Sequence, residues 1–262
     1  MRHLPLIDSA TLLSLTLLSA GPCLAAEPDS VRLEELRTRY QERLRELGPT
    51  PRERLAQVAV EPKVRAELRE RIEDFAYIQQ QGGTRLIRWK RRDAVIERYG
   101  VKAAPFLCEV LGSKRYWSAR ISAQALGTLA QRAPKQVRWL AMHDDAPSQL
   151  IARFNAGPDY ELVGLHLDLD AALRALTGLD PLAEELELSQ RASEERARRE
   201  GARAQALWRA AYAKHREAWL KRERQRARER RELERKLDLV ERGVDPERAD
   251  EPARGRPQPA DP

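Results

Sequence analysis

Apolar residues recur at steps of three and four along most of the chain, the spacing of an α-helix that buries one face. In the N-terminal part, this spacing predicts three helices, which cover residues 30–47, 62–80 and 84–99. A glycine-containing break follows each of them, and glycine readily adopts the left-handed conformation that ends a helix. We expect residues 27–83 to form an N-terminal helical hairpin or coiled coil.

The middle of the chain, residues 84–180, has a different pattern of apolar and polar positions. Its apolar content is higher, and breaks that contain glycine, proline or aspartate recur at short intervals. Between positions 100 and 178 this pattern predicts four to six helices of about 8–15 residues, packed as antiparallel pairs. We therefore expect a separate helical domain over this part of the chain.

The segment 181–242 predicts one long helix or two helices in series, because beyond its first residue Gly201 is its only glycine or proline. Its first half has an apolar seam. Residues 221–232 carry Ala227 as their only apolar side chain, so this stretch is expected to be solvated on all sides. Residues 243–262 contain five prolines and many charges, which predicts a disordered tail.

The N-terminus, residues 1–26, has the layout of a secretory signal peptide. A positive start precedes an apolar run at 10–20, and small residues allow cleavage after Ala25 or Ala26. A membrane anchor is the first alternative, but the run is shorter than the roughly 20 apolar residues that a spanning helix needs. Lipid attachment at Cys23 and a buried N-terminal helix are further alternatives that the flanking residues disfavour. We expect a periplasmic or secreted mature chain without a transmembrane helix.

The composition favours exposed helices over a large enzyme core. Charged residues make up 34% of the chain and aromatic residues 5%, and the formal net charge is +7. Arginine supplies 40 of the 48 basic residues, which we interpret first as the codon bias of a GC-rich genome. Once the signal is removed, Cys108 is the only cysteine, so an intrachain disulfide is excluded and its apolar neighbours predict a buried thiol.

Two stretches carry motifs of closely packed helix pairs. The first comprises residues 100–111 (GVKAAPFLCEVL) followed by residues 120–129 (RISAQALGTL). The second comprises residues 170–178 (DAALRALTG). Small residues such as Gly127 let neighbouring helices approach, and leucines fill the groove between them. Over about residues 90–180 the chain resembles HEAT-type helical-repeat proteins of the exported bacterial kind. The resemblance implies a short, irregular HEAT-like α-solenoid; an irregular α-helical bundle is the alternative interpretation of the same residues.

Two clusters of histidine and aspartate are candidates for chemistry. In a strand, His166, Asp168 and Asp170 would share one face and bind a metal, but we favour a loop whose aspartate caps a helix starting at 171. Residues 143–145 (His-Asp-Asp) predict helix termination and capping rather than an acid–base pair. Glycine-rich phosphate loops, nucleophile elbows and His-Glu-x-x-His patterns are missing from the sequence. We therefore expect no catalytic residues, no metal site and no cofactor.

The segment 190–242 has a basic surface, with 18 lysines and arginines against 10 aspartates and glutamates. Arginines four residues apart repel each other, so the helix is not self-neutralised. The candidate interaction residues here are Arg222, Arg224, Arg226, Arg228, Arg230 and Arg231. Residues 214–236 are candidates for contact with an anionic envelope surface, held by charge because 221–232 lacks an apolar face. A solvated spacer is the alternative.

Together these patterns predict an all-α protein: a short HEAT-like solenoid flanked by an N-terminal hairpin and a long charged helix. We expect a non-catalytic exported scaffold that binds an unidentified protein partner. Trp89, Trp117 and Trp139 are possible contact residues in a helical groove, and each also fits a core position. The alternative is a basic helical binder of anionic envelope polymers. If the signal is misinterpreted, the chain is instead a cytoplasmic nucleic-acid-binding or coiled-coil adaptor; export disfavours a nucleic-acid partner.

Overall fold

The computed structural model describes the chain over residues 28–77, 85–112, 116–156, 162–183, 185–188 and 193–249. The predicted signal peptide, residues 1–26, lies outside the described residues. The side chain of Trp89 also lies outside them. The chain divides into two compact units. The larger is Leu47–Glu229, and the smaller joins the residues up to Glu46 with those from Arg230 onward.

All regular structure in these described ranges is helical, and no strand occurs there, so the predicted all-α class is confirmed. The helices are α1 (Pro28–Leu47), α2 (Pro51–Val58), α3 (Pro62–Tyr77), α4 (Arg85–Tyr99), the 3-10 helix η1 (Gly100–Ala103), α5 (Ala104–Leu111), α6 (Tyr116–Arg132), α7 (Pro134–His143), α8 (Ala146–Ala152), α9 (Leu162–Thr177), α10 (Glu194–Glu241) and α11 (Pro246–Ala249).

The helix ends follow local sequence signals. Gly48 and Gly100 have φ of 72° and 52°, so the predicted breaks occur at residues in the left-handed region. Helix α2, which the apolar spacing did not predict, begins with a capping box. The Thr50 hydroxyl accepts from the Glu53 backbone N–H at 3.2 Å, and the Glu53 carboxylate accepts from the Thr50 N–H at 2.7 Å.

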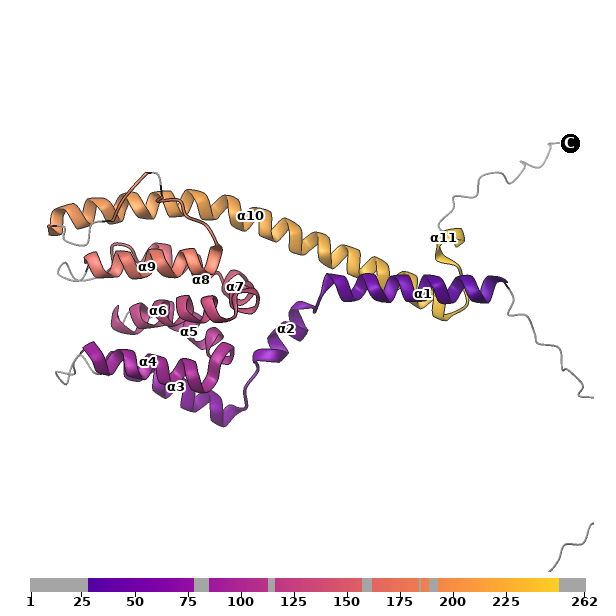
Figure 1. Ribbon diagram of the computed structural model, residues 1–262, viewed down its shortest axis with the longest axis horizontal. Coiled ribbons are helices and arrows are strands. Elements are labelled where there is room, and N and C mark those ends of the chain that lie inside the picture. The colour runs from indigo at the N-terminus through magenta and orange to yellow at the C-terminus, as the bar shows by residue number, and fades with distance from the viewer. Residues whose placement is uncertain are drawn as a thin grey trace, which may run out of the picture. The chain divides into compact units, whose positions relative to one another are not determined.

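The larger unit packs around α6, which contacts α3, α4, α5, α7 and α9. In Figure 1 these helices lie in successive layers, and the first part of α10 lies along α9. Helix α6 is buried on nearly all sides because its interior is built of small residues. At Gly127 an added Cβ would lie 3.4 Å from the Ala172 Cα, so this glycine permits close contact between α6 and α9.

The structure differs from the predicted N-terminal hairpin over 27–83. Helix α3 belongs to the core of the larger unit, where Leu68, Ile72 and Phe75 are fully buried. Helix α1 instead belongs to the smaller unit, where Leu36 and Tyr40 are buried. The predicted domain boundary near 84 therefore runs through one continuous core.

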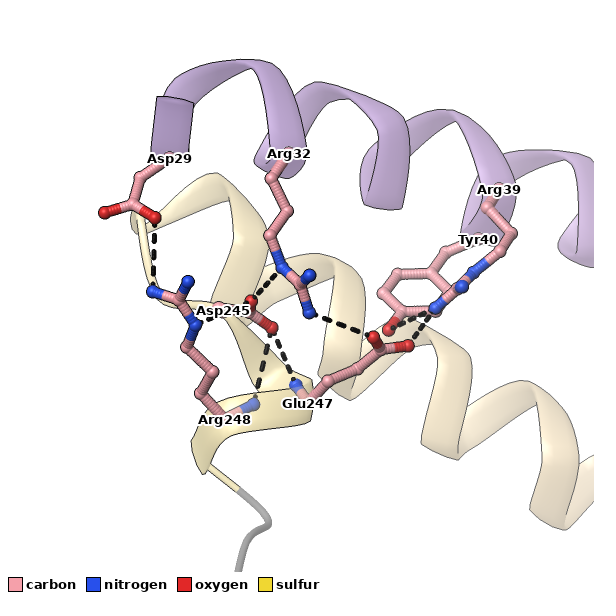
Figure 2. A network of polar contacts seen from close by, with 7 residues as sticks. All are labelled: Asp29, Arg32, Arg39, Tyr40, Asp245, Glu247 and Arg248. Atoms are coloured by element: carbon pink, nitrogen blue, oxygen red, sulfur yellow. Dashed lines mark hydrogen bonds and ion pairs between the residues drawn. The ribbon is translucent and has the colours of Figure 1, made fainter. Parts of the chain in front are cut away.

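The smaller unit joins α1 to the C-terminal end of α10 and to α11. Leu36, Tyr40 and Val240 form its buried apolar cluster. Around it, Asp245 accepts from the Arg32 Nε at 2.5 Å, Glu247 pairs with Arg32 and Arg39, and Arg248 pairs with Asp29 at 3.1 Å (Figure 2). We call these polar residues, with Tyr40, the terminal clasp.

Part of the segment 243–262, which was predicted to be a disordered tail, is helical and belongs to the terminal clasp. Residues 246–249 form α11, because the Asp245 carboxylate accepts from the backbone N–H groups of Glu247 and Arg248 at 2.9 and 3.4 Å. Residues 250–262 lie outside the described part of the chain. Among the described helices, none combines the length and the apolar character needed to cross a membrane.

Candidate functional site

Helix α10 is one continuous helix of 48 residues. Of the two predictions for residues 181–242, one long helix or two in series, the first therefore describes the chain from Glu194 to Glu241. It begins later than the sequence indicates: Leu182 is buried in a turn segment that precedes it. Its interior contains no proline and only Gly201, which explains how it continues without a break.

The first half of α10 is fixed to the larger unit through Ala204, Trp208 and Tyr212, which follow each other at four-residue steps and are buried. The Trp208 Nε1 donates to Asp170 Oδ1 at 2.9 Å, and the Arg174 Nε donates to the other oxygen at 2.7 Å. Burial raises the pKa of Asp170, while the hydrogen bonds from Trp208 and Arg174 oppose that rise. The carboxylate is thereby a paired, buried acceptor that orients α10.

A second polar contact holds α10 one turn further on. The Tyr212 hydroxyl donates to Asp145 Oδ1 at 2.8 Å, and Arg216 forms an ion pair with the same carboxylate. Burial raises the pKa of Tyr212 to about 12, so the phenol remains a donor at neutral pH. Because Asp145 has φ of 54°, the chain turns sharply between α7 and α8 and directs this residue to α10.

The predicted termination at residues 143–145 is confirmed, since α7 ends at His143. The predicted capping is not what the side chains do. Asp145 occupies the N-cap position of α8, but its side chain makes no cap hydrogen bond and serves α10 instead. His143 Nδ1 lies 2.8 Å from Asp144 Oδ1.

The predicted loop and cap at His166, Asp168 and Asp170 are wrong, because all three lie inside α9. The alternation of leucine with polar residues also fits a helix, since His166 and Asp170 are four apart and both face the interior. His166 Nε2 contacts the Phe154 carbonyl oxygen, and Arg120 donates to Asp168 at 2.5 Å. No group of three His, Cys, Asp or Glu gathers in a metal-binding arrangement within the ranges described.

Cys108 is buried in α5, as predicted. Burial raises the pKa of its thiol, and the negative charges of Asp144 and Glu109 raise it further. A thiol in these surroundings is a poor nucleophile.

The predicted arginines lie on more than one side of α10. Arg224 and Arg228 line an open hollow of about 750 Å³, together with Arg216 and Lys221, whereas Arg222 and Arg226 do not line it. We call Arg216, Lys221, Arg224 and Arg228 the α10 basic face. The other residues that line the hollow are Ala213, Glu217, Leu220 and Gln225. The lining residues that the structure describes all belong to α10, so the hollow is a groove on the surface of this helix.

Charge on the α10 basic face is incompletely compensated. Arg224 and Arg228 are exposed, and neither forms an ion pair with a carboxylate in the described ranges. Arg226, on another side of the helix, pairs with Glu223 at 3.1 Å. Arg230 is half-buried and Arg231 is exposed. The sequence pattern indicated the basic segment, but it did not identify Arg216 and Lys221 as part of the same face.

Of the three tryptophans named from the sequence, the structure describes the side chains of Trp117 and Trp139, and these two differ in burial. Trp139 is 6% exposed, stacks on His143 with ring centroids 5.0 Å apart, and donates its Nε1 to Glu223 of α10 at 3.4 Å. Trp117 is half-buried beside Tyr116. Trp139 is therefore mainly a packing residue that also contacts α10.

Comparison with known proteins adds no further assignment: no protein-family profile, curated protein or solved structure matches this chain.

Proposed function

We propose that this chain is a non-catalytic interaction module that binds an acidic protein partner along the α10 basic face. The observation that carries the proposal is the exposure of Arg224 and Arg228 without a carboxylate partner among the described residues, beside Lys221 on the same groove. Several like charges on one rigid surface attract an oppositely charged partner and orient it before contact.

The charge balance of the segment supports this proposal. Residues 214–231 carry nine lysines and arginines against three glutamates. A single exposed ion pair contributes about 0.2–1 kcal/mol, so useful affinity requires several of them acting together. The contacts of Trp208 and Tyr212 hold this stretch of α10 in one orientation, which reduces the entropy lost on binding.

The groove favours a polypeptide over a uniformly charged polymer. Leu220 lies among its cationic side chains, Ala213 lies at its N-terminal end, and Glu217 adds one acidic group. An acidic helix with occasional apolar side chains complements this mixture, with carboxylates toward the cations and an apolar contact at Leu220.

Contact with an anionic envelope surface through residues 214–236 is the second candidate. The observation that favours it is the position of Arg222 and Arg226 outside the groove, which extends positive charge around the helix. Such a surface would be held by charge alone, because the stretch 221–232 lacks an apolar face for insertion.

We further propose that α5, α6 and α9 form a short HEAT-like array in an exported protein. The close approach at Gly127 supports the repeat interpretation, and the signal-like residues 1–26 support a periplasmic or secreted location. Proteolytic mapping of the mature N-terminus in envelope fractions tests the location: cleavage after Ala25 or Ala26 is expected, and an intact cytosolic chain contradicts it.

The binding proposal is tested by titrating the full chain with a fluorescent acidic helical peptide, a peptide with every Glu replaced by Gln, and vesicles of anionic lipid. We expect the acidic peptide to bind, the Gln peptide to bind at least about tenfold more weakly, and added salt to reduce the difference. Equal binding of the two peptides contradicts the proposal. Strong binding to vesicles with none to the acidic peptide favours the second candidate.

A further inference from the structure

A cavity of about 240 Å³ lies between α2 and α7 in the larger unit. Its apolar wall is formed by Val58, Trp139 and Leu140, and the first two turns of α7 form one side of it. Trp139 is held in place by its stack on His143 and by its hydrogen bond to Glu223. The cavity wall therefore includes an aromatic side chain whose position is fixed by packing.

Two cations line this apolar space. The Arg54 guanidinium carbon lies 5.1 Å from the centre of the Trp139 ring, and the Arg54 Nε donates to the Pro49 carbonyl at 3.2 Å. Lys135 lines the cavity from the first turn of α7. Neither Arg54 nor Lys135 forms an ion pair with a carboxylate of the residues that the structure describes. The Arg54 terminal nitrogens and the Lys135 ammonium are thus available to an anion.

Two amides complete the polar side of the cavity. Gln136 Nε2 donates to Gln57 Oε1 at 3.3 Å. That bond orients the pair and leaves the Gln57 amide nitrogen as a donor. The first turn of a helix also has a positive electrostatic potential, which adds to the charge of Lys135.

We propose that this cavity binds a small aromatic carboxylate, such as an arylacetate anion. The carboxylate contacts Arg54 and Lys135, and the apolar body packs against Trp139 and Val58. A planar guanidinium binds a carboxylate through two parallel hydrogen bonds, which distinguishes an acid from an amide or an amine. The volume is below the usual range for drug-sized ligands, so a small aromatic ring system with a short acidic side chain matches it.

The inference is tested with three probes that share the indole ring system: indole-3-acetate, indole-3-acetamide and tryptamine. Binding to the full chain is measured by ligand-observed nuclear magnetic resonance and by calorimetry. We expect indole-3-acetate to bind with a dissociation constant of about a millimolar or tighter, as a ligand of this size allows. The amide should bind at least about fivefold more weakly, and the amine should show no saturable binding.

The variant Arg54→Gln/Lys135→Gln removes both cations of the cavity, and we expect it to lose about tenfold or more in affinity for indole-3-acetate. Its matched control is Arg52→Gln/Lys63→Gln, which removes the same charge from exposed residues of α2 and α3 outside the cavity. The control should bind as the unchanged protein does. Circular dichroism of both variants verifies that the helices are retained.

Equal loss in the two double variants would overturn the inference, because general attraction to a basic protein would then explain the binding. Absence of saturable binding to the unchanged chain, or equal binding of acid and amide, also overturns it. The variant Arg224→Gln/Arg228→Gln should bind indole-3-acetate normally, so failure of the proposed function and failure of this inference are distinguishable.

Discussion

At the scale of single residues, the docking of α10 depends on the absence of a side chain at Gly201. A Cβ at this position would overlap the His166 ring and lie 2.7 Å from the Asn155 side-chain oxygen. The ring cannot move easily because it is buried, stacks on Phe154 with centroids 5.7 Å apart, and contacts the Phe154 carbonyl.

The change Gly201→Ala should therefore destabilise the protein by about 1–3 kcal/mol, although alanine is the better helix former by about 1 kcal/mol. Urea unfolding measures the change. Gly112→Ala is the control, because there the nearest atom to an added Cβ lies at 3.5 Å. Destabilisation of both variants to the same extent would contradict the overlap.

His166 should make stability depend on pH. Burial lowers its pKa below the usual 6.5, against opposing effects of the Phe154 carbonyl and the Glu200 carboxylate. The unfolded chain then binds the proton more readily, so the stabilising contribution is complete above about pH 6.5 and is lost as pH falls toward the lower folded-state pKa.

We expect the unchanged chain to lose more stability between pH 7.5 and pH 5.5 than His166→Asn does. Urea midpoints at the two pH values provide the comparison. His215, whose pKa is lowered by burial and by Arg222, is present in both proteins and so cancels in the difference. Identical losses would rule out His166 as the source.

The roles of residues 166–170 show the limit of sequence interpretation at this scale. Alternating polar and leucine residues over a short stretch fit a strand, a loop or a helix. What decides between them is the set of partners, Arg120 on α6, Trp208 on α10 and the Phe154 carbonyl. Those partners are between 12 and 48 residues away in the chain.

At the scale of elements, α10 is the part best predicted from sequence. The absence of proline and the presence of one glycine over almost fifty residues favour an unbroken helix, whatever the tertiary contacts are. Its start was not predictable. Residues 181–183 and 185–188 are irregular although they are rich in helix-forming residues, and the packing of Leu182 overrides that preference.

The hydrogen bond from Trp208 to Asp170 should anchor α10. Trp208→Phe removes the donor and leaves a buried carboxylate with one partner fewer, at a cost of about 1–3 kcal/mol before any loss of packing. Hydrogen exchange should show faster opening of residues 194–212. Trp219→Phe, at a half-buried position of the same helix, is the control. An equal effect of the two changes would indicate loss of apolar volume alone.

At the scale of the whole molecule, the sequence predicted the helical class but not the pairing of its first helix. Judged from sequence alone, the apolar stripe of residues 30–47 can pack against residues 62–80 as well as against any distant segment. Its actual neighbours, Val240 and the C-terminal residues of the clasp (245–248), lie about 200 residues away. Helical spacing shows which face is buried, and it contains no information on the helix that covers it.

The terminal clasp should depend on Asp245. Burial tends to raise the pKa of Asp245, but the Arg32 hydrogen bond and two backbone N–H groups outweigh it and hold the pKa below its usual value. A lowered carboxyl pKa stabilises the folded state above the unfolded pKa, and this contribution is lost in acid. Asp245→Asn should therefore speed hydrogen exchange of α1 at neutral pH. Asp238→Asn, whose partner Arg242 lies on the same exposed turn, should not.

The central claim, that the α10 basic face binds an acidic partner, is tested most directly by two double variants with the same loss of charge. Arg224→Gln/Arg228→Gln alters the groove, and Arg222→Gln/Arg226→Gln alters other sides of the same helix. Their dissociation constants for the acidic helical peptide are compared at one salt concentration. We predict that the first loses about fivefold or more in affinity and the second less than about twofold. Equal losses, or no loss in the first variant, would contradict the claim.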